Sequence, residues 1–178
     1  MNGMSIQPVD VASFKRAMSQ LAAAVTIVTT GTADDPRGTT VSAFMSLSAD
    51  PPMVLISLHE ASSLLAKIDV GAPIGVNVLS TSQDTLARRF ADKSLDRFAG
   101  VDWAMANGVP KLANNHTWVA GRVNSIIAGG DHRLVLVDVE HAEVNTNSPL
   151  LYWQREFGTH GAIQPGDVHT QSVKSQDF

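Results

Sequence analysis

The chain has 178 residues, of which 13 are lysine or arginine and 17 are aspartate or glutamate, so its net charge is −4. Hydrophobic residues make up 44% and charged residues only 17%, against roughly 25% in an average soluble domain. The absence of cysteine excludes disulfides, thiolate metal sites and a cysteine nucleophile. Without a basic block or an apolar run of about 20 residues, nucleic acid and membranes are poor candidates as partners. We expect one cytoplasmic domain over residues 1–178, with an ordered core over about 10–160 and a flexible tail over 161–178.

The first third of the chain predicts a helix followed by several strands. After Asp10, which suits an N-cap, apolar residues recur at helical spacing: Val11, Phe14, Met18 and Leu21. We expect this helix to pack on the core as a lid. The β-branched stretch 24–30 and the turn-forming cluster 31–38 predict a hairpin. Two further strands, over 39–48 and 52–58, are separated by prolines, which lack the N–H that a central strand needs.

The remaining elements follow at short intervals. They are a short helix over 61–69 capped by Ser62 or Ser63, a strand over 73–80, a helix over 81–93, a turn-rich surface tract over 94–115, strands over 117–127 and 134–144, and a patterned piece over 149–158. Glycines between the last two strands permit positive φ and therefore a tight connection. Many short strands with few helices predict a mainly β fold with flanking helices, arranged as a small antiparallel barrel.

The motifs of several enzyme classes are absent from the sequence. The six histidines show no zinc-binding spacing, so no metal site is predicted. The sequence has no nucleophile elbow, no Walker loop and no glycine-rich dinucleotide fingerprint after a strand. A nicotinamide would therefore have to bind in another way.

Hydroxyl-bearing and loop residues are the remaining candidates for a site. Residues 38–42 place small side chains where a flat ligand could approach the backbone, although ordinary strand surface has the same composition. Ser62 and Ser63 could hold a phosphate at a helix start or simply cap that helix. Arg88 and Arg89 could be solvated cations at a helix end, and His132 a turn residue bonded to backbone.

Taken in order, several segments resemble the short-chain flavin reductase family, the reductase components of two-component flavin-dependent monooxygenases. The matching segments are FKRAMSQLAAAVTIVTT (14–30), GTTVSAFMSLSADPP (38–52), ASSL (61–64), PIGVNVLS (73–80), LARRFADKSLDRFAGVDW (86–103), GGDHRLVL (129–136) and PLLYWQREFG (149–158). They cover nearly the whole chain from Phe14 to Gly158. The resemblance implies a split β-barrel with an FMN-binding fold, a homodimer, and reduction of FMN or FAD by NADH, with NADPH possible.

The resemblance also implies roles for individual residues. The isoalloxazine ring would be lined by Thr39, Thr40, Val41 and Ser42, with Ser46, Ser48, Ala49 and Asp50 nearby. The phosphate and ribityl end would be held by Ser62, Ser63, Arg89 and Phe90. His132 would lie beside the nicotinamide as the catalytic residue, in a pocket that Tyr152 and Arg155 help to close.

Three functions remain open at this stage. The leading one is an NAD(P)H-dependent flavin reductase that supplies reduced flavin to a separate monooxygenase. The alternative is a flavin-binding electron carrier or redox sensor without turnover of free flavin, and a weaker possibility is a flavin-dependent oxidase. Because a fold supports many chemistries, it does not separate these functions.

Overall fold

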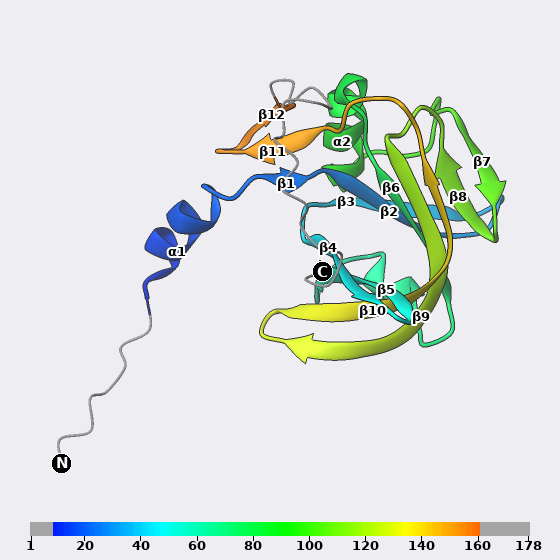
Figure 1. The fold of residues 1–178 in the computed structure, drawn as a ribbon, viewed down its shortest axis with the longest axis horizontal. Coiled ribbons are helices and arrows are strands. Elements are labelled where there is room, and N and C mark those ends of the chain that lie inside the picture. Colours follow the sequence, from blue (N-terminus) through cyan, green and yellow to red (C-terminus); the bar gives the residue numbers. More distant parts are fainter. Residues whose placement is uncertain (1–8, 161–178) are drawn as a thin grey trace, which may run out of the picture.

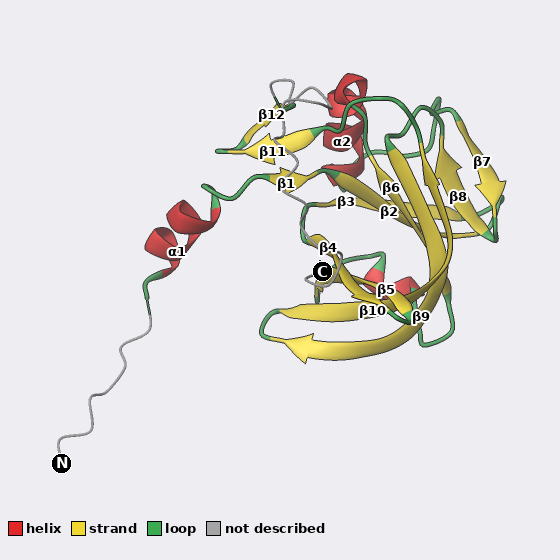
Figure 2. Cartoon of the chain, in the orientation of Figure 1, coloured by secondary structure: helices red, strands yellow, loops and turns green. Residues whose placement is uncertain are grey.

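The computed structural model describes residues 9–160; the flexible tail predicted over 161–178 lies outside the described residues. The helices are α1 (Val11–Met18), η1 (Leu65–Lys67), η2 (Thr81–Gln83) and α2 (Asp84–Ala91). The strands are β1 (Ala23–Ala24), β2 (Thr26–Gly31), β3 (Pro36–Val41), β4 (Phe44–Ala49), β5 (Pro52–His59), β6 (Pro73–Val78), β7 (Trp103–Ala106), β8 (Val109–Leu112), β9 (Thr117–Gly129), β10 (His132–Val144), β11 (Leu151–Trp153) and β12 (Glu156–Gly158). Strands dominate the fold (Figure 2), as the sequence predicts.

One antiparallel sheet of seven strands forms the body, in the order β3-β2-β6-β9-β10-β5-β4. The long strands β9 and β10 curve strongly and carry the sheet around the core (Figure 1). The sheet begins at β3 and ends at β4, which are not paired with each other, so the barrel is open between these two edges. A split barrel has this arrangement.

The interior of the barrel is filled by β-branched and leucine side chains. Strand β5 alternates partly buried and fully buried positions, as expected for a strand with one face toward the core. By contrast, β6 is buried along almost its whole length, because it lies in the middle of the sheet. The largest core cluster includes Val28, Ile56, Leu64, Ile74, Val76 and Val135.

A second apolar cluster lies between the sheet and α2. Phe90 of α2 is fully buried and packs edge-on against Phe98, with ring centroids 5.0 Å apart. Gly38 of β3 is required here, because a Cβ at this position would lie 2.8 Å from Cε1 of Phe90. The close approach of α2 to β3 fixes the strand edge beside which the candidate site lies.

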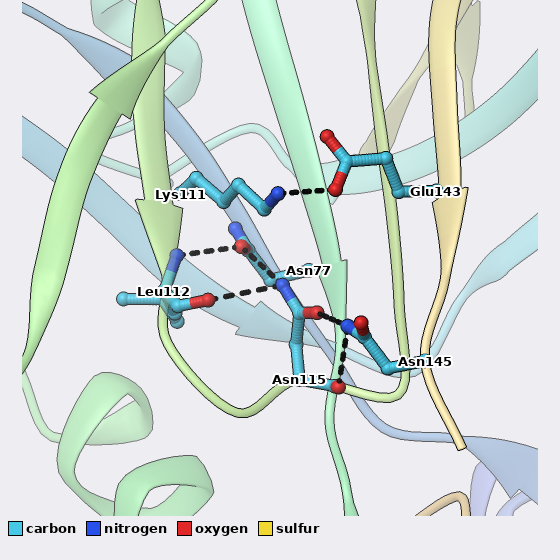
Figure 3. Close-up of polar contacts among 6 residues, drawn as sticks. All are labelled: Asn77, Lys111, Leu112, Asn115, Glu143 and Asn145. Atoms are coloured by element: carbon cyan, nitrogen blue, oxygen red, sulfur yellow. Dashed lines mark hydrogen bonds and ion pairs between the residues drawn. The ribbon is translucent and has the colours of Figure 1, made fainter. Parts of the chain in front are cut away.

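Buried asparagines tie the β7–β8 hairpin to the barrel (Figure 3). The Asn77 carboxamide oxygen accepts hydrogen bonds from the Leu112 N–H (2.8 Å) and from Asn115 Nδ2 (3.3 Å). The Asn115 side-chain oxygen accepts from Asn145 Nδ2 at 2.9 Å, and Lys111 pairs with Glu143 at 2.5 Å nearby. Since buried polar groups cost free energy unless they are bonded, this network specifies how the hairpin docks.

The structure corrects four expectations about elements. Residues 103–112 form a hairpin inside the tract predicted to be irregular, and the strand predicted over 39–48 is broken at residues 42–43. The segment after β5 yields only one 3-10 turn, with Leu64 at its N-cap position and no side-chain cap, so Ser62 and Ser63 do not cap it. Helix α1 forms with Asp10 as its cap, yet none of its residues is buried, so it is not a core-packing lid.

Candidate functional site

A pocket of about 270 Å³, here called the edge pocket, lies at the open side of the barrel. Its lining comes from the end of β3, the turn after it, the end of β5, the loops that follow β5 and α2, and the start of β10. The lining residues are Thr39, Thr40, Val41, Ser42, Ala43, Ser57, Leu58, His59, Ser62, Ser63, Lys93, Arg97 and His132. Seven of the residues predicted from the sequence therefore meet in one place: Thr39, Thr40, Val41, Ser42, Ser62, Ser63 and His132.

Strand β3 presents mainly backbone to the edge pocket. The Val41 side chain is buried in the core, and the Thr40 hydroxyl donates to the Ala87 carbonyl oxygen of α2 at 2.7 Å. Because β3 is an edge strand, the backbone N–H groups on its outer side have no neighbouring strand to bond. Such N–H groups can donate hydrogen bonds to a flat ligand with carbonyl or ring-nitrogen acceptors.

The turn after β5 brings two serines to the edge pocket. The Ser62 N–H donates to the His59 carbonyl oxygen at 2.8 Å, which closes this turn. Within residues 9–160, neither the Ser62 nor the Ser63 hydroxyl makes a hydrogen bond. Both hydroxyls are thus available as donors to a ligand, although no helix dipole of significant length supports them.

Histidine 132 lies at the tip of the β9–β10 hairpin, next to the Gly130-Asp131 turn. Its Nδ1 lies 2.7 Å from Asp131 Oδ1, and its ring packs edge-on against His59 with centroids 5.2 Å apart. The hydrogen bond donated by His132 is the main cause that lowers the pKa of Asp131. With Nδ1 held in this way, Nε2 of His132 is the nitrogen left for a ligand.

The cations of the edge pocket are Lys93 and Arg97, which the sequence analysis did not single out. Arg97 Nη1 donates to the Gly38 carbonyl oxygen at 2.6 Å and Nε to the Asp92 carbonyl oxygen at 2.9 Å. Partial burial lowers the pKa of Arg97, and the negative charge of Asp92 opposes this shift. The repeated Arg-Phe pair, at 89–90 and again at 97–98, is the sequence signal that could have found Arg97.

Arg89 and Phe90 lie away from the edge pocket. The Arg89 guanidinium donates to three carbonyl oxygens of the next loop, those of Asp96 (2.9 Å), Arg97 (3.0 Å) and Ala99 (2.7 Å). Phe90 is 0% exposed and belongs to the core. Both residues therefore act on the site indirectly: Arg89 braces the loop that carries Lys93 and Arg97, and Phe90 anchors α2.

Tyr152 and Arg155 line a neighbouring pocket of about 560 Å³, here called the hairpin pocket, which shares Thr40 and Ser42 with the edge pocket. Arg155 has a φ of 69° in the turn between β11 and β12. The Arg88 guanidinium, which also lines this pocket, lies 4.7 Å from the centre of the Phe157 ring. The predicted closing residues are thus adjacent to the edge pocket and not inside it.

Besides Arg89 and Phe90, four further predicted residues line neither of these two pockets: Ser46, Ser48, Ala49 and Asp50. They lie on β4 and in the turn after it, at the other edge of the sheet. A bulge at Leu47 interrupts the alternation between Ser46 and Ser48 along β4, because Ser46 pairs with Val54 and Ser48 with Met53.

Neither a candidate metal site nor a membrane-spanning helix is found among the described residues. Within residues 9–160, no group of three histidine or acidic side chains could hold a metal ion. Among the described residues, no helix is long and apolar enough to cross a membrane.

The split barrel and its edge pocket define a protein that can hold a flat, phosphorylated ligand on strand backbone, free hydroxyls and two cations. Residues 18–161 match the model of the flavin reductase like domain. The chain belongs to this family, so the predicted family and the predicted split-barrel fold are confirmed.

Similar proteins are known by sequence and by structure. The reductase component of a 4-nitrophenol 4-monooxygenase/4-nitrocatechol 2-monooxygenase from Rhodococcus opacus is 35% identical over 153 residues, which cover 86% of this chain and 83% of that protein. The NADH:FMN oxidoreductase of Rhodococcus erythropolis is 34% identical, over 81% of this chain and 79% of that protein. The solved Streptomyces globisporus NADH:FAD oxidoreductase SgcE6, in complex with NAD and FAD fragments, has a TM-score of 0.81 and 29% identity, over 89% of this chain and 98% of that chain.

Proposed function

We propose that this protein is an NAD(P)H:flavin oxidoreductase that transfers hydride from NADH to FMN or FAD and supplies reduced flavin to a partner monooxygenase. The observation that carries the proposal is the edge pocket, where backbone of β3, two serine hydroxyls, two cations and His132 converge. The similarity to NADH:flavin oxidoreductases and to monooxygenase reductase components supports it.

The residues of the edge pocket fit a flavin. Lys93 and Arg97 can bind a phosphate through charge-assisted hydrogen bonds, and the free hydroxyls of Ser62 and Ser63 can complete its coordination. The outer backbone N–H groups of β3 can stabilise negative charge that develops on the ring during reduction. A bound flavin supplies the hydride chemistry itself. This role of the flavin agrees with the absence of a nucleophile elbow from the sequence.

His132 is the residue assigned to the nicotinamide. Asp131 accepts the hydrogen bond from Nδ1 and orients the ring, so Nε2 can contact the carboxamide of a nicotinamide. Correct placement of two reacting groups can supply several kcal/mol of a barrier. The role of His132 is therefore to position the hydride donor and not to transfer a proton.

The test is NADH consumption at 340 nm with FMN or FAD titrated in. We expect saturable, flavin-dependent oxidation, and a decrease of about tenfold in kcat/KM for His132→Ala, equivalent to about 1.4 kcal/mol of transition-state binding. His141→Ala is the matched control, because His141 is an exposed residue of the same strand and lies outside the edge pocket. Tight flavin binding without NADH oxidation would instead support the electron-carrier function.

We also propose that the protein is a homodimer. The apolar residues of α1 face solvent, with Val11 67%, Phe14 52% and Met18 45% exposed. An isolated helix of eight residues is marginal in water, and an exposed apolar face of this kind is typical of an interface. The low charged fraction of the chain agrees with a surface that is partly covered.

A further inference from the structure

Two histidines stand opposite each other where β5 ends and β10 begins, and the proposed function uses only His132. His59 is the residue paired with His132 in the register of the two strands. Both side chains line the edge pocket, and their rings pack edge-on with centroids 5.2 Å apart. The His59 side chain is 56% exposed, so it is not part of the core. Its position points to a role in the site.

One side of the His59 ring organises the turn that carries Ser62 and Ser63. The Ala61 N–H donates to His59 Nδ1 at 3.0 Å, and the Ser62 N–H donates to the His59 carbonyl oxygen at 2.8 Å. His59 therefore accepts hydrogen bonds from two backbone N–H groups of this turn. Because Nδ1 is an acceptor here, the proton of the neutral imidazole lies on Nε2.

The other side of the His59 ring faces Asp131 and His132. Nε2 of His59 lies 4.0 Å from Asp131 Oδ2, while His132 Nδ1 lies 2.7 Å from Oδ1 of the same carboxylate. The Glu60 N–H donates to the Asp131 carbonyl oxygen at 3.0 Å, which holds the tip of the β9–β10 hairpin against the end of β5. The Glu60 carboxylate pairs with Arg133 at 2.7 Å, so Asp131 is the carboxylate next to His59.

We propose that His59 is a positioning residue that couples the two halves of the edge pocket. Its Nδ1 side holds the turn that presents the Ser62 and Ser63 hydroxyls to the flavin. Its Nε2 side contacts the Asp131–His132 pair that orients the nicotinamide. This inference rests on the proposed function, which assigns the turn to the flavin and His132 to the nicotinamide. Through His59, the place of the turn sets the orientation of His132 and thus the alignment that hydride transfer needs.

A substitution that separates the two sides of His59 tests this coupling. In His59→Asn, the side-chain oxygen can accept the Ala61 N–H as in an Asx turn, but the ring and Nε2 are lost. We expect the Kd for FMN to stay within about twofold of the wild-type value and kcat/KM for NADH to fall about fivefold. In His59→Leu, which loses both sides, FMN affinity and kcat/KM should each fall about fivefold. His141→Asn is the matched control, since His141 is exposed on β10 and lies outside the edge pocket.

A double-mutant cycle shows whether His59 acts through His132. We expect His59→Asn to lower kcat/KM about fivefold in the wild-type background and less than about twofold when His132 is already alanine. A purely structural effect would lower kcat/KM equally in both backgrounds, and that result would overturn the proposal. Wild-type kcat/KM in His59→Asn would overturn it as well.

A measurement without turnover separates this proposal from the proposed function. The hydrogen bond from His132 is the main cause of the lowered pKa of Asp131, and the positive charge of protonated His59 adds to it. In the flavin-free protein, His59→Asn should therefore raise the pKa of Asp131 toward 3.8, by less than His132→Ala does, as measured by carbon-13 NMR. An unchanged pKa of Asp131 would contradict the role of His59. If this pKa shifts but the wild-type protein does not oxidise NADH, the proposed function is refuted and the contact of His59 with Asp131 stands.

Discussion

Arg89 illustrates how a cation in a family motif can serve the fold more than the ligand. Its guanidinium donates to three carbonyl oxygens of the loop that carries Lys93 and Arg97. We expect Arg89→Ala to lower the free energy of unfolding by about 2 kcal/mol, because hydrogen bonds from a charged donor contribute about 1.5–3 kcal/mol and two of these are partly exposed. Chemical denaturation measures this difference.

Arg88→Ala is the matched control for that prediction. Arg88 lies on the same helix, but its guanidinium contacts the face of the Phe157 ring, an interaction worth about 0.5–1 kcal/mol at an exposed site. Equal losses of stability in the two variants would contradict the bracing role of Arg89. Arg89→Ala should weaken flavin binding only indirectly, by loosening the loop that carries Lys93 and Arg97. Arg97→Gln should weaken flavin binding more, because Arg97 itself lines the edge pocket.

The Asp131–His132 hydrogen bond predicts a measurable difference in the pKa of Asp131 between the wild-type protein and His132→Ala. The hydrogen bond from His132 lowers the pKa of Asp131 below its ordinary value of 3.8. A lowered pKa in the folded state means that the stabilisation is present above pH 3.8 and is lost as the pH falls through the folded-state pKa. In His132→Ala, the pKa of Asp131 should return toward 3.8. Carbon-13 NMR of the Asp131 carboxyl group checks this, and an identical titration in both proteins would exclude the contact.

At the scale of elements, the β9–β10 pair depends on one glycine. Gly121 lies where the register of the two strands shifts, and a Cβ there would lie 1.9 Å from the Asp138 carbonyl oxygen. Since the obstacle is backbone, it cannot rotate away. We expect Gly121→Ala to cost about 1–3 kcal/mol of stability. Gly158→Ala is the control because no atom lies within 4 Å of its added Cβ, and thermal unfolding that shows equal shifts would contradict the argument.

Some of the strands could be predicted from the sequence, and others could not. Strands with strong β-branched patterns, such as β2 and β6, were predicted near their observed bounds, since their pattern reflects a buried position. The β7–β8 hairpin was missed although Asn107-Gly108 is a strong turn signal: both residues have positive φ, of 47° and 79°. Its strands are short and contain Pro110, so their own pattern is weak.

The candidate site was predictable in part through the family resemblance. Residues 39–42 and His132 line one pocket, as the resemblance implies, although β3 and β10 are not neighbours in the sheet. The positions of Arg89 and Arg97 depend on how a loop without secondary structure folds back on α2. The local sequence pattern does not predict the conformation of this loop, because contacts with residues distant in the sequence determine it.

For the whole molecule, the exposed face of α1 leads to the last prediction. Phe14 and Met18 lie one turn apart on a helix with no buried residue, which stands apart from the barrel (Figure 1). We expect sedimentation velocity at micromolar concentration to show a dimer for the wild-type protein. The double variant Phe14→Asp/Met18→Asp should be a monomer, because burying two carboxylates in an apolar contact costs several kcal/mol. Lys15→Asp, on the same helix, should remain dimeric, and a wild-type monomer would refute an interface built on α1.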